Sequence, residues 1–215
     1  MIFATAVFYC LMFAVAWFWL RVEESQGIFL MGLRDGLPLG LAAGIAAAAF
    51  VVAASRLGHK RFQWARALED EFRSILGKRG GAEVLALAIF SGVAEEAFFR
   101  GAMQEAWGLV PTSLIFGGIH FVPRRVYLPW TLFAIVVGFL LGWIYVATGN
   151  IYAPIAAHVL INALNLWKIC GPGAPPTLLH PSKIPLSMIS EMEIPPAAPE
   201  ERPPPGDSAP PEPLP

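Results

Sequence analysis

Long apolar runs separated by short polar stretches occupy the first 170 residues of the chain. A bilayer core about 30 Å thick requires about 20 apolar residues in helical conformation. Residues 2–20 meet that length without a charged side chain, and residues 37–54 form a second run rich in Ala and Gly. Further apolar runs lie near residues 84–106, 109–122, 128–148 and 151–169. The pattern predicts an all-α fold, a polytopic transmembrane helical bundle of about six membrane segments.

Residues 56–81 differ from the runs on either side because basic and apolar side chains alternate there. Positions 56–79 hold seven Lys and Arg residues, interleaved with side chains such as Phe62, Trp64 and Phe72 at roughly helical spacing. A helix with one basic and one apolar face lies on a membrane surface. We therefore expect this segment to form a basic amphipathic helix on the cytoplasmic side. Anchoring the chain to the membrane surface is sufficient to explain such a helix.

The end of the chain changes character again. Fifteen of the 20 prolines fall between Pro172 and Pro215, and proline-rich sequence cannot build a packed core. We expect a disordered tail, with docking of a proline-binding partner as the alternative. The predicted organisation is two N-terminal transmembrane helices (residues 1–55), the amphipathic segment (56–81), a helical core (82–170) and the tail (171–215).

Composition and charge narrow the class of protein. The chain is 56% hydrophobic and 14% charged, against about 25% charged residues in a soluble domain. A net charge of −1 provides no basic field, so nucleic acid is not an expected partner. The two cysteines, Cys10 and Cys170, form neither a CxxC pair nor a zinc-ligand spacing. Because 12 of the 15 basic residues fall on one side of the predicted spans, the positive-inside rule predicts cytoplasmic N- and C-termini.

Two adjacent carboxylates and an arginine lie inside the third apolar run. Ionisable groups in hydrocarbon are costly, so each is a functional hypothesis by default. Arg100 follows Glu96 by four residues, a spacing that places both side chains on one helical face. The spacing predicts a buried structural ion pair between Arg100 and Glu96 and leaves Glu95 to face another partner.

The remaining polar residues of the spans come from two other segments. His120 ends the fourth run after Phe116 and two glycines, and His158 lies four residues before Asn162 on one face of the sixth run. A helix-to-helix hydrogen bond is the structural alternative for each of them. Together with Glu95 they supply a general base, imidazoles and an amide donor for an oxyanion, the set that hydrolysis requires. GxSxG and HExxH motifs are absent, and Ser91 has no evident catalytic partner.

The polar residues form three motifs: Glu95-Glu96-x-x-x-Arg100, Phe116-x-x-x-His120 and His158-x-x-x-Asn162. In this order on separate membrane segments, these motifs resemble those of the CPBP (Abi) family. This family comprises CAAX-processing and bacteriocin-processing membrane proteases related to the Ras-converting CAAX endopeptidase. The resemblance runs from about residue 84 to residue 166 and implies an all-helical intramembrane endopeptidase. It implies that Glu95 activates water, with Glu96 as a less critical neighbour, and that Arg100 is structural. It also implies that His120 and His158 are catalytic and that Asn162 stabilises the oxyanion.

The resemblance leaves the mechanism and the substrate open. The family is described both as glutamate-type and as metalloprotease, so the alternative to metal-free hydrolysis is a divalent metal such as zinc held by Glu95, His120 and His158. We expect a membrane-anchored protein or peptide as substrate, and the Ala- and Pro-rich composition favours a bacterial inner membrane. The alternative functions are a non-catalytic scaffold or bacteriocin immunity factor and, less favoured without visible inverted repeats, a proton-coupled transporter.

Overall fold

The computed structural model describes residues 2–24 and 27–175, and every regular element among them is helical. The all-α prediction is therefore confirmed for this part of the chain. The chain divides into a unit of residues 1–178 and a unit of residues 179–215, and the second lies outside the described residues, as does most of the predicted tail. The elements are α1 (Ile2–Val22), α2 (Gly27–Arg34), α3 (Leu37–Arg61), α4 (Gln63–Leu76), α5 (Gly81–Glu96), the π-helix η1 (Ala97–Met103), α6 (Gln104–Trp107), α7 (Leu109–Ile119), the 3-10 turn η2 (Arg125–Tyr127), α8 (Leu128–Thr148) and α9 (Tyr152–Cys170).

Four of the described helices are long and apolar enough to cross a membrane. They are α1, α3, α8 together with η2, and α9, and they correspond to four of the six predicted segments. The segment near 84–106 is the helical run α5–η1–α6, which carries several charged residues, and α7 has only 11 residues. The count of six membrane segments stays a prediction.

Helices α3, α8 and α9 pack around one apolar core. Its buried side chains include Val51 of α3, Leu141 of α8 and Ile161 of α9. Small residues bring the helices together, because a Cβ atom on Gly44 would lie 2.4 Å from the carbonyl oxygen of Ala153. In a membrane, close approach of this kind is a main source of helix association. This packing fixes the position of α9, which carries two of the candidate catalytic residues.

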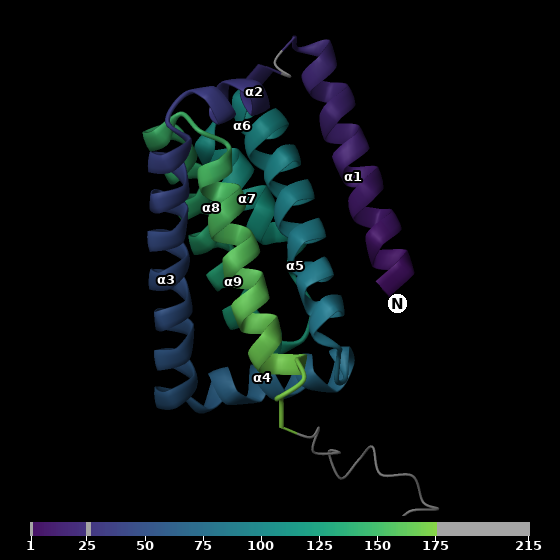
Figure 1. Ribbon diagram of the computed structural model, residues 1–215. Coiled ribbons are helices and arrows are strands. Elements are labelled where there is room, and N and C mark those ends of the chain that lie inside the picture. The colour runs from purple at the N-terminus through teal and green to yellow at the C-terminus, as the bar shows by residue number, and fades with distance from the viewer. Residues whose placement is uncertain (1, 25–26, 176–215) are drawn as a thin grey trace, which may run out of the picture. The chain divides into compact units, whose positions relative to one another are not determined.

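Helix α4 crosses the ends of α3 and α9 (Figure 1). Its Glu69 is buried and binds Arg73 at 2.7 Å, His59 of α3 at 2.7 Å and the ammonium group of Lys168 in α9. A helix is present within the segment predicted to be basic and amphipathic, but it begins at Gln63, because α3 continues through the basic residues up to Arg61. Helix α4 itself is not basic, since it carries two basic and three acidic residues. Ionic contacts, in addition to apolar ones, attach α4 to the bundle.

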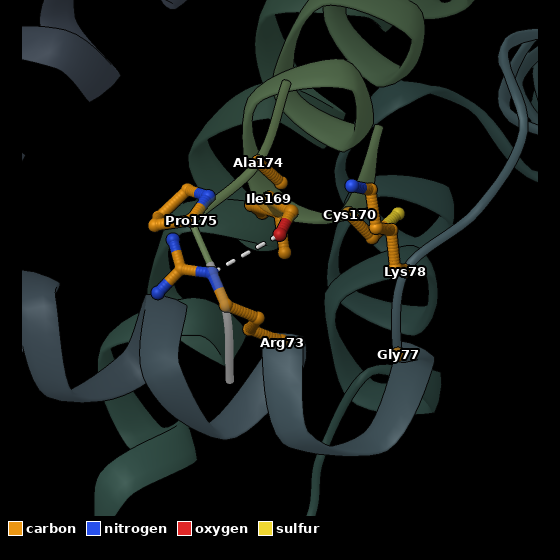
Figure 2. Close-up of a pocket in the computed structure, with 7 residues that line it drawn as sticks. All are labelled: Arg73, Gly77, Lys78, Ile169, Cys170, Ala174 and Pro175. Atoms are coloured by element: carbon orange, nitrogen blue, oxygen red, sulfur yellow. Dashed lines mark hydrogen bonds between the residues drawn. The ribbon is translucent and has the colours of Figure 1, made fainter. Parts of the chain in front are cut away.

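A small pocket lies where α4 meets the end of α9. Its volume is about 150 Å³, and Figure 2 shows Arg73 Nε donating to the carbonyl oxygen of Ile169, at 3.2 Å. Lys78, Cys170 and Pro175 also line it. None of the candidate catalytic residues lines this pocket. We interpret it as a gap in the packing between α4 and the end of α9.

Helix α1 packs along α5 and η1 and contacts them with one face. Ala16 and Leu20 are fully buried on that face, and the Trp19 ring lies 6.1 Å from the Phe98 ring. The opposite face exposes large apolar side chains such as Phe8 and Phe18, as expected of a helix that faces lipid. Helix α1 therefore covers one side of the helical run α5–η1.

Candidate active site

The centre of the site is the junction of α5 and the π-helix η1. Arg100 is fully buried, and its Nη1 donates to Glu96 Oε1 at 2.9 Å. The ion pair expected from the four-residue spacing is present. Arg100 Nη2 donates to the carbonyl oxygen of Gly138 in α8 at 2.9 Å, and one turn on, Gln104 donates to the carbonyl oxygen of Gly142 at 3.0 Å. π-helical turns occur frequently at functional sites, and this one is held against α8 by two such bonds.

His158 joins α9 to this ion pair. Its Nδ1 lies 2.6 Å from Glu96 Oε1, the same oxygen that accepts from Arg100. The approach depends on Gly92, because a Cβ atom there would lie 2.6 Å from Cγ2 and 2.9 Å from the backbone nitrogen of Val159. A carboxylate only accepts hydrogen bonds, so Nδ1 carries the proton and Nε2 faces away from Glu96.

Glu95 faces the free nitrogen of the same histidine. Its Oε2 lies 4.0 Å from His158 Nε2, and both residues are only 6% exposed. Oε2 has no hydrogen-bond partner among the described residues. A separation of 4.0 Å is too long for a direct hydrogen bond and is one that a single water molecule can bridge.

His120 occupies the end of α7, close to the same cluster. Its Nδ1 lies 2.6 Å from the carbonyl oxygen of Phe116, so this nitrogen also carries a proton and Nε2 is left as an acceptor. The Trp130 ring packs against His120 edge-on at 4.9 Å, and the Thr131 hydroxyl donates to the His120 carbonyl oxygen at 3.3 Å. His120 is partly exposed, unlike His158.

The Phe116 ring connects the members of the site. Its centroid lies 4.8 Å from that of His120, 6.0 Å from that of His158 and 4.6 Å from the guanidinium carbon of Arg100. The ring reaches these neighbours because α7 approaches α8 closely, where a Cβ atom on Gly117 would lie 2.9 Å from the Cα of Ile135. Phe116 thus brings His120 and His158 to one ring, and the expectation that Glu95 lines one cavity with both histidines stays a prediction.

Asn162 has a partner that the sequence did not reveal. Its Nδ2 donates to Ser91 Oγ at 2.9 Å, and Ser91 Oγ in turn lies 2.8 Å from the carbonyl oxygen of Leu87. The sequence pattern alone indicates no catalytic partner for Ser91. Ser91 lies one turn before Glu95 on the same helical face, and a residue there can orient a side chain on a facing helix. This spacing is the feature of the sequence from which a role for Ser91 could be predicted.

A three-ligand metal site is the alternative that the resemblance leaves open for these residues. No group of three or more His, Cys, Asp or Glu side chains placed to hold a metal ion occurs among residues 2–24 and 27–175. His158 Nδ1 is bound to Glu96 and His120 Nδ1 to a carbonyl oxygen, which leaves the two Nε2 atoms as the ring nitrogens that a metal could bind. The metal ligation expected for Glu95, His120 and His158 stays a prediction.

Part of the chain is similar to known proteins. Residues 81–164 match the model of a family described as type II CAAX prenyl endopeptidase Rce1-like, which confirms the resemblance to the CPBP family. The chain is 39% identical over 99 residues to Uncharacterized protein YpbD of Bacillus subtilis (strain 168). That match covers 45% of this chain and 51% of the relative, so the chain spans about half the length of the relative it matches. No solved structure matches the chain.

Proposed function

We propose that this chain, whose residues 81–164 match the Rce1-like family model, is an intramembrane endopeptidase that cleaves a membrane-anchored protein or peptide. The family match supports a protease of the CAAX type, and the apolar helices indicate an integral membrane protein. The assignment of Glu95 as the base, with His120, His158 and Asn162 assisting, is the finer part of the proposal.

The observation that carries the proposal is the 4.0 Å separation between Glu95 Oε2 and His158 Nε2. A water molecule between these atoms donates one hydrogen bond to each acceptor and presents its oxygen lone pairs to a substrate carbonyl. Glu96 and Arg100 support this geometry from behind, because Glu96 fixes the His158 ring and Arg100 compensates the buried charge of Glu96.

The reaction follows from these positions. Glu95 accepts a proton from the water while the water oxygen forms a bond to the carbonyl carbon of the scissile peptide. The oxyanion that develops receives a hydrogen bond from the amide N–H of Asn162 that is not donated to Ser91. The carbon–nitrogen bond then breaks, and the proton held by Glu95 passes to the leaving amine nitrogen. His120, beside Phe116, orients the carbonyl group.

The cellular setting is part of the same proposal. The distribution of basic residues supports cytoplasmic termini, and the composition supports a bacterial inner membrane. The family description names a prenyl CAAX substrate, whereas the bacterial composition favours another C-terminal tail or a bacteriocin-like peptide. We further propose the residues from Pro172 onward as the place where a partner or substrate is selected. Removal of residues 172–215 should then alter substrate choice.

The test compares membrane proteomes of cells that carry the wild-type chain, Glu95→Ala or His120→Ala at equal protein abundance. If the chain is a protease, one precursor with an intact C-terminal peptide accumulates in both variants. If neither variant changes any peptide and both rescue the deletion phenotype, the chain acts as a scaffold and the proposed protease function is wrong. Glu105→Gln serves as the matched control, since it changes another glutamate of the same helical run.

A further inference from the structure

Aromatic side chains connect helix α4 to His120. The Phe72 ring of α4 packs edge-on against the Trp130 ring, with the two centroids 5.1 Å apart. Trp130 in turn packs edge-on against His120 at 4.9 Å. Helix α4 precedes residues 81–164, the part of the chain that the family model matches. The three motifs include neither Phe72 nor Trp130, so the family match gives these contacts no role.

His120 is attached to the bundle differently from His158. His120 follows Ile119, the last residue of α7, and is partly exposed. Its Nδ1 is bonded to the carbonyl oxygen of Phe116, which belongs to the same helix. That bond does not connect the ring to another helix, whereas the buried His158 ring is bonded to Glu96 across two helices. The orientation of His120 therefore depends on the rings that pack against it.

Trp130 and Phe116 together restrict the His120 ring. The Phe116 ring lies 4.8 Å from the imidazole at an interplanar angle of 47°, and the Trp130 ring lies at 4.9 Å and 82°. Two aromatic neighbours at such different angles limit the rotation of the imidazole about its side-chain bonds. The hydroxyl of Thr131, the residue after Trp130, donates to the His120 carbonyl oxygen at 3.3 Å. The start of α8 thus contacts both the ring and the backbone of His120.

Two adjacent residues of α4 contact the connection between α7 and α8. Glu71 accepts hydrogen bonds from Arg124 at 3.0 and 3.2 Å and from the Tyr127 hydroxyl at 3.4 Å. Phe72 packs edge-on against Tyr127 at 5.6 Å, in addition to its contact with Trp130. Polar and aromatic contacts therefore both place α4 against this connection, and Phe72 limits the movement of Trp130 away from α7.

We propose that Phe72 and Trp130 are positioning residues of the proposed protease, and that α4 holds the His120 ring in place through them. The inference rests on the proposed function, in which His120 orients the substrate carbonyl group. Trp130 contacts the imidazole and Phe72 contacts Trp130, so both act through His120 and not on the substrate. Helix α4 thereby has a role beyond anchoring, because a helix outside the family match fixes a catalytic side chain.

The first measurement is the tautomer of His120, observed by NMR. The full-length chain carries ¹⁵N in its histidine rings and is studied in detergent micelles at alkaline pH, where imidazoles are neutral. The His120 signals are those that disappear in His120→Gln. Because Nδ1 is bonded to a carbonyl oxygen, the wild-type signals should report a proton on Nδ1. We expect Phe72→Ala and Trp130→Ala to shift them toward a mixture of both tautomers, since a ring that rotates loses this bond.

The second measurement is the half-life, in cells at equal protein abundance, of the precursor that accumulates with Glu95→Ala. We expect Phe72→Ala and Trp130→Ala to lengthen this half-life about tenfold, because small displacements of a catalytic group slow the chemical step. Trp130→Phe keeps an aromatic ring against His120. It should retain the His120 signals of the wild type and restore most of the processing rate.

The matched controls are Phe62→Ala and Trp64→Ala. These residues are the same types, and their rings stack on each other at 5.6 Å at the start of α4. Both are 50% exposed. Their substitution removes the same rings from the same part of the chain, so we expect unchanged His120 signals and an unchanged half-life. Equal shifts in these controls would mean that α4 only stabilises the fold, and would overturn the inference.

The inference and the proposed function fail in different ways. Unshifted His120 signals in Phe72→Ala or Trp130→Ala overturn the inference. Processing that requires Glu95 and is equally fast in both variants overturns it too, while the proposed function stands. If no precursor accumulates with Glu95→Ala, the proposed function is wrong, and a shift of the His120 signals then reports packing without catalysis.

Discussion

Glu95 and Glu96 are neighbours in the chain but have different surroundings. Glu96 Oε1 accepts from Arg100 and faces His158 Nδ1, and the Glu96 side chain is fully buried. The Oε2 atom of Glu95 has no partner among the described residues and lies 4.0 Å from His158 Nε2. Adjacent helical residues point about 100° apart, so one carboxylate serves the structure and the other remains available to a water molecule.

The first prediction concerns the ion pair. Arg100→Met should lower the free energy of unfolding by about 3–5 kcal/mol, because it leaves the buried Glu96 carboxylate without its cation. The measurement is thermal or denaturant unfolding in detergent micelles. Arg124→Met is the control, since Arg124 forms an exposed pair with Glu71, and it should change the midpoint little. Equal effects of the two substitutions would contradict the structural role of Arg100.

The second prediction separates chemistry from stability at the two glutamates. Glu95→Gln should lower kcat by about 10²- to 10⁴-fold, because an amide cannot accept the proton of water. The unfolding midpoint of this variant should stay close to that of the wild type. Glu96→Gln should lower the midpoint, because it weakens the bonds to both Arg100 and His158. Paired kinetic and unfolding measurements decide, and a reversed pattern would exchange the roles of the two residues.

Contacts within one helix were more predictable from the sequence than contacts between helices. The four-residue spacing of Glu96 and Arg100 led directly to their ion pair. The bond from Arg100 to the Gly138 carbonyl and that from Asn162 to Ser91 join residues 38 and 71 positions apart. Such bonds depend on the rotation and depth of two packed helices, which hydrophobic periodicity does not specify in segments that are apolar on every side.

The helices approach one another closely at a few glycines. These close contacts determine how the helices that carry the site residues are placed. Gly92 of α5 faces the backbone of Val159 in α9, the residue after His158. Gly117 of α7 faces Ile135 of α8 in the same way. A one-methyl change at such a contact must move a helix, because backbone atoms cannot turn aside as a flexible side chain can.

The third prediction follows from the contact at Gly92. Gly92→Ala should lower the free energy of unfolding by about 1–3 kcal/mol and reduce kcat, because it pushes α9, and with it His158, away from Glu95. Gly58→Ala in α3 is the matched control. A Cβ atom there meets nothing within 4 Å, so this change should stabilise the helix by about 0.5–1 kcal/mol. Unfolding midpoints and kcat of both variants test the prediction, and an unaffected Gly92→Ala chain would show that α5 and α9 are not packed as described.

The fourth prediction concerns the attachment of α4. Glu69 binds Arg73, His59 and Lys168, so it links α4 to both α3 and α9. Glu69→Gln should weaken these links and increase amide hydrogen exchange in residues 63–76 by about tenfold or more, with little change in α8. Asp70→Asn is the control, since the Asp70 side chain is exposed and binds only the neighbouring Arg73 in this cluster. Equal exchange in the two variants would contradict the role of Glu69.

The helix boundaries differ from those expected from hydropathy where charged side chains or the backbone geometry also determine where a helix ends. The hydropathy run that ended near residue 54 continues as helix to Arg61, because its last turns carry basic side chains that leave the membrane without ending the helix. The π-helix η1 and the short helix α2 were not predicted. Neither has a hydrophobic period distinct from that of an α-helix, so the pattern alone could not reveal them.

At the scale of the whole unit of residues 1–178, contacts group the chain into two ends. At one end, Arg124 binds Glu71 at 3.0 Å and Lys168 binds Glu69, so α4, the start of α8 and the end of α9 lie together. At the other end, Asn150 Nδ2 donates to the carbonyl oxygens of Gly32 at 2.9 Å and Asp35 at 3.1 Å. The first end carries most of the basic residues, so from the positive-inside rule we expect it to be the cytoplasmic end.

The short helix α7 decides whether the chain crosses the membrane six times. Its 11 residues span about 16 Å, less than the hydrocarbon thickness of about 30 Å. It nevertheless runs from Leu109, close after the end of α6, to His120, whose ring packs against Trp130 near the start of α8. A short crossing is tolerated when neighbouring helices bury it, and α7 packs along α8.

The fifth prediction tests this topology in cells with single introduced cysteines, in a chain where Cys10 and Cys170 are replaced by Ala. Asp35→Cys and Trp107→Cys should react with a membrane-impermeant maleimide in spheroplasts, because both positions lie at the end without the basic cluster. Ser74→Cys and Arg124→Cys should react only after permeabilisation, since Glu71 and Lys168 place them at the basic end. All four positions are exposed, so a lack of labelling reports the side of the membrane and not burial.

If Trp107→Cys and Arg124→Cys label together, α7 does not cross and the count of six segments is wrong. If all four labels are exchanged, the count stands and the basic end faces outward, which would place α4 on the extracytoplasmic side.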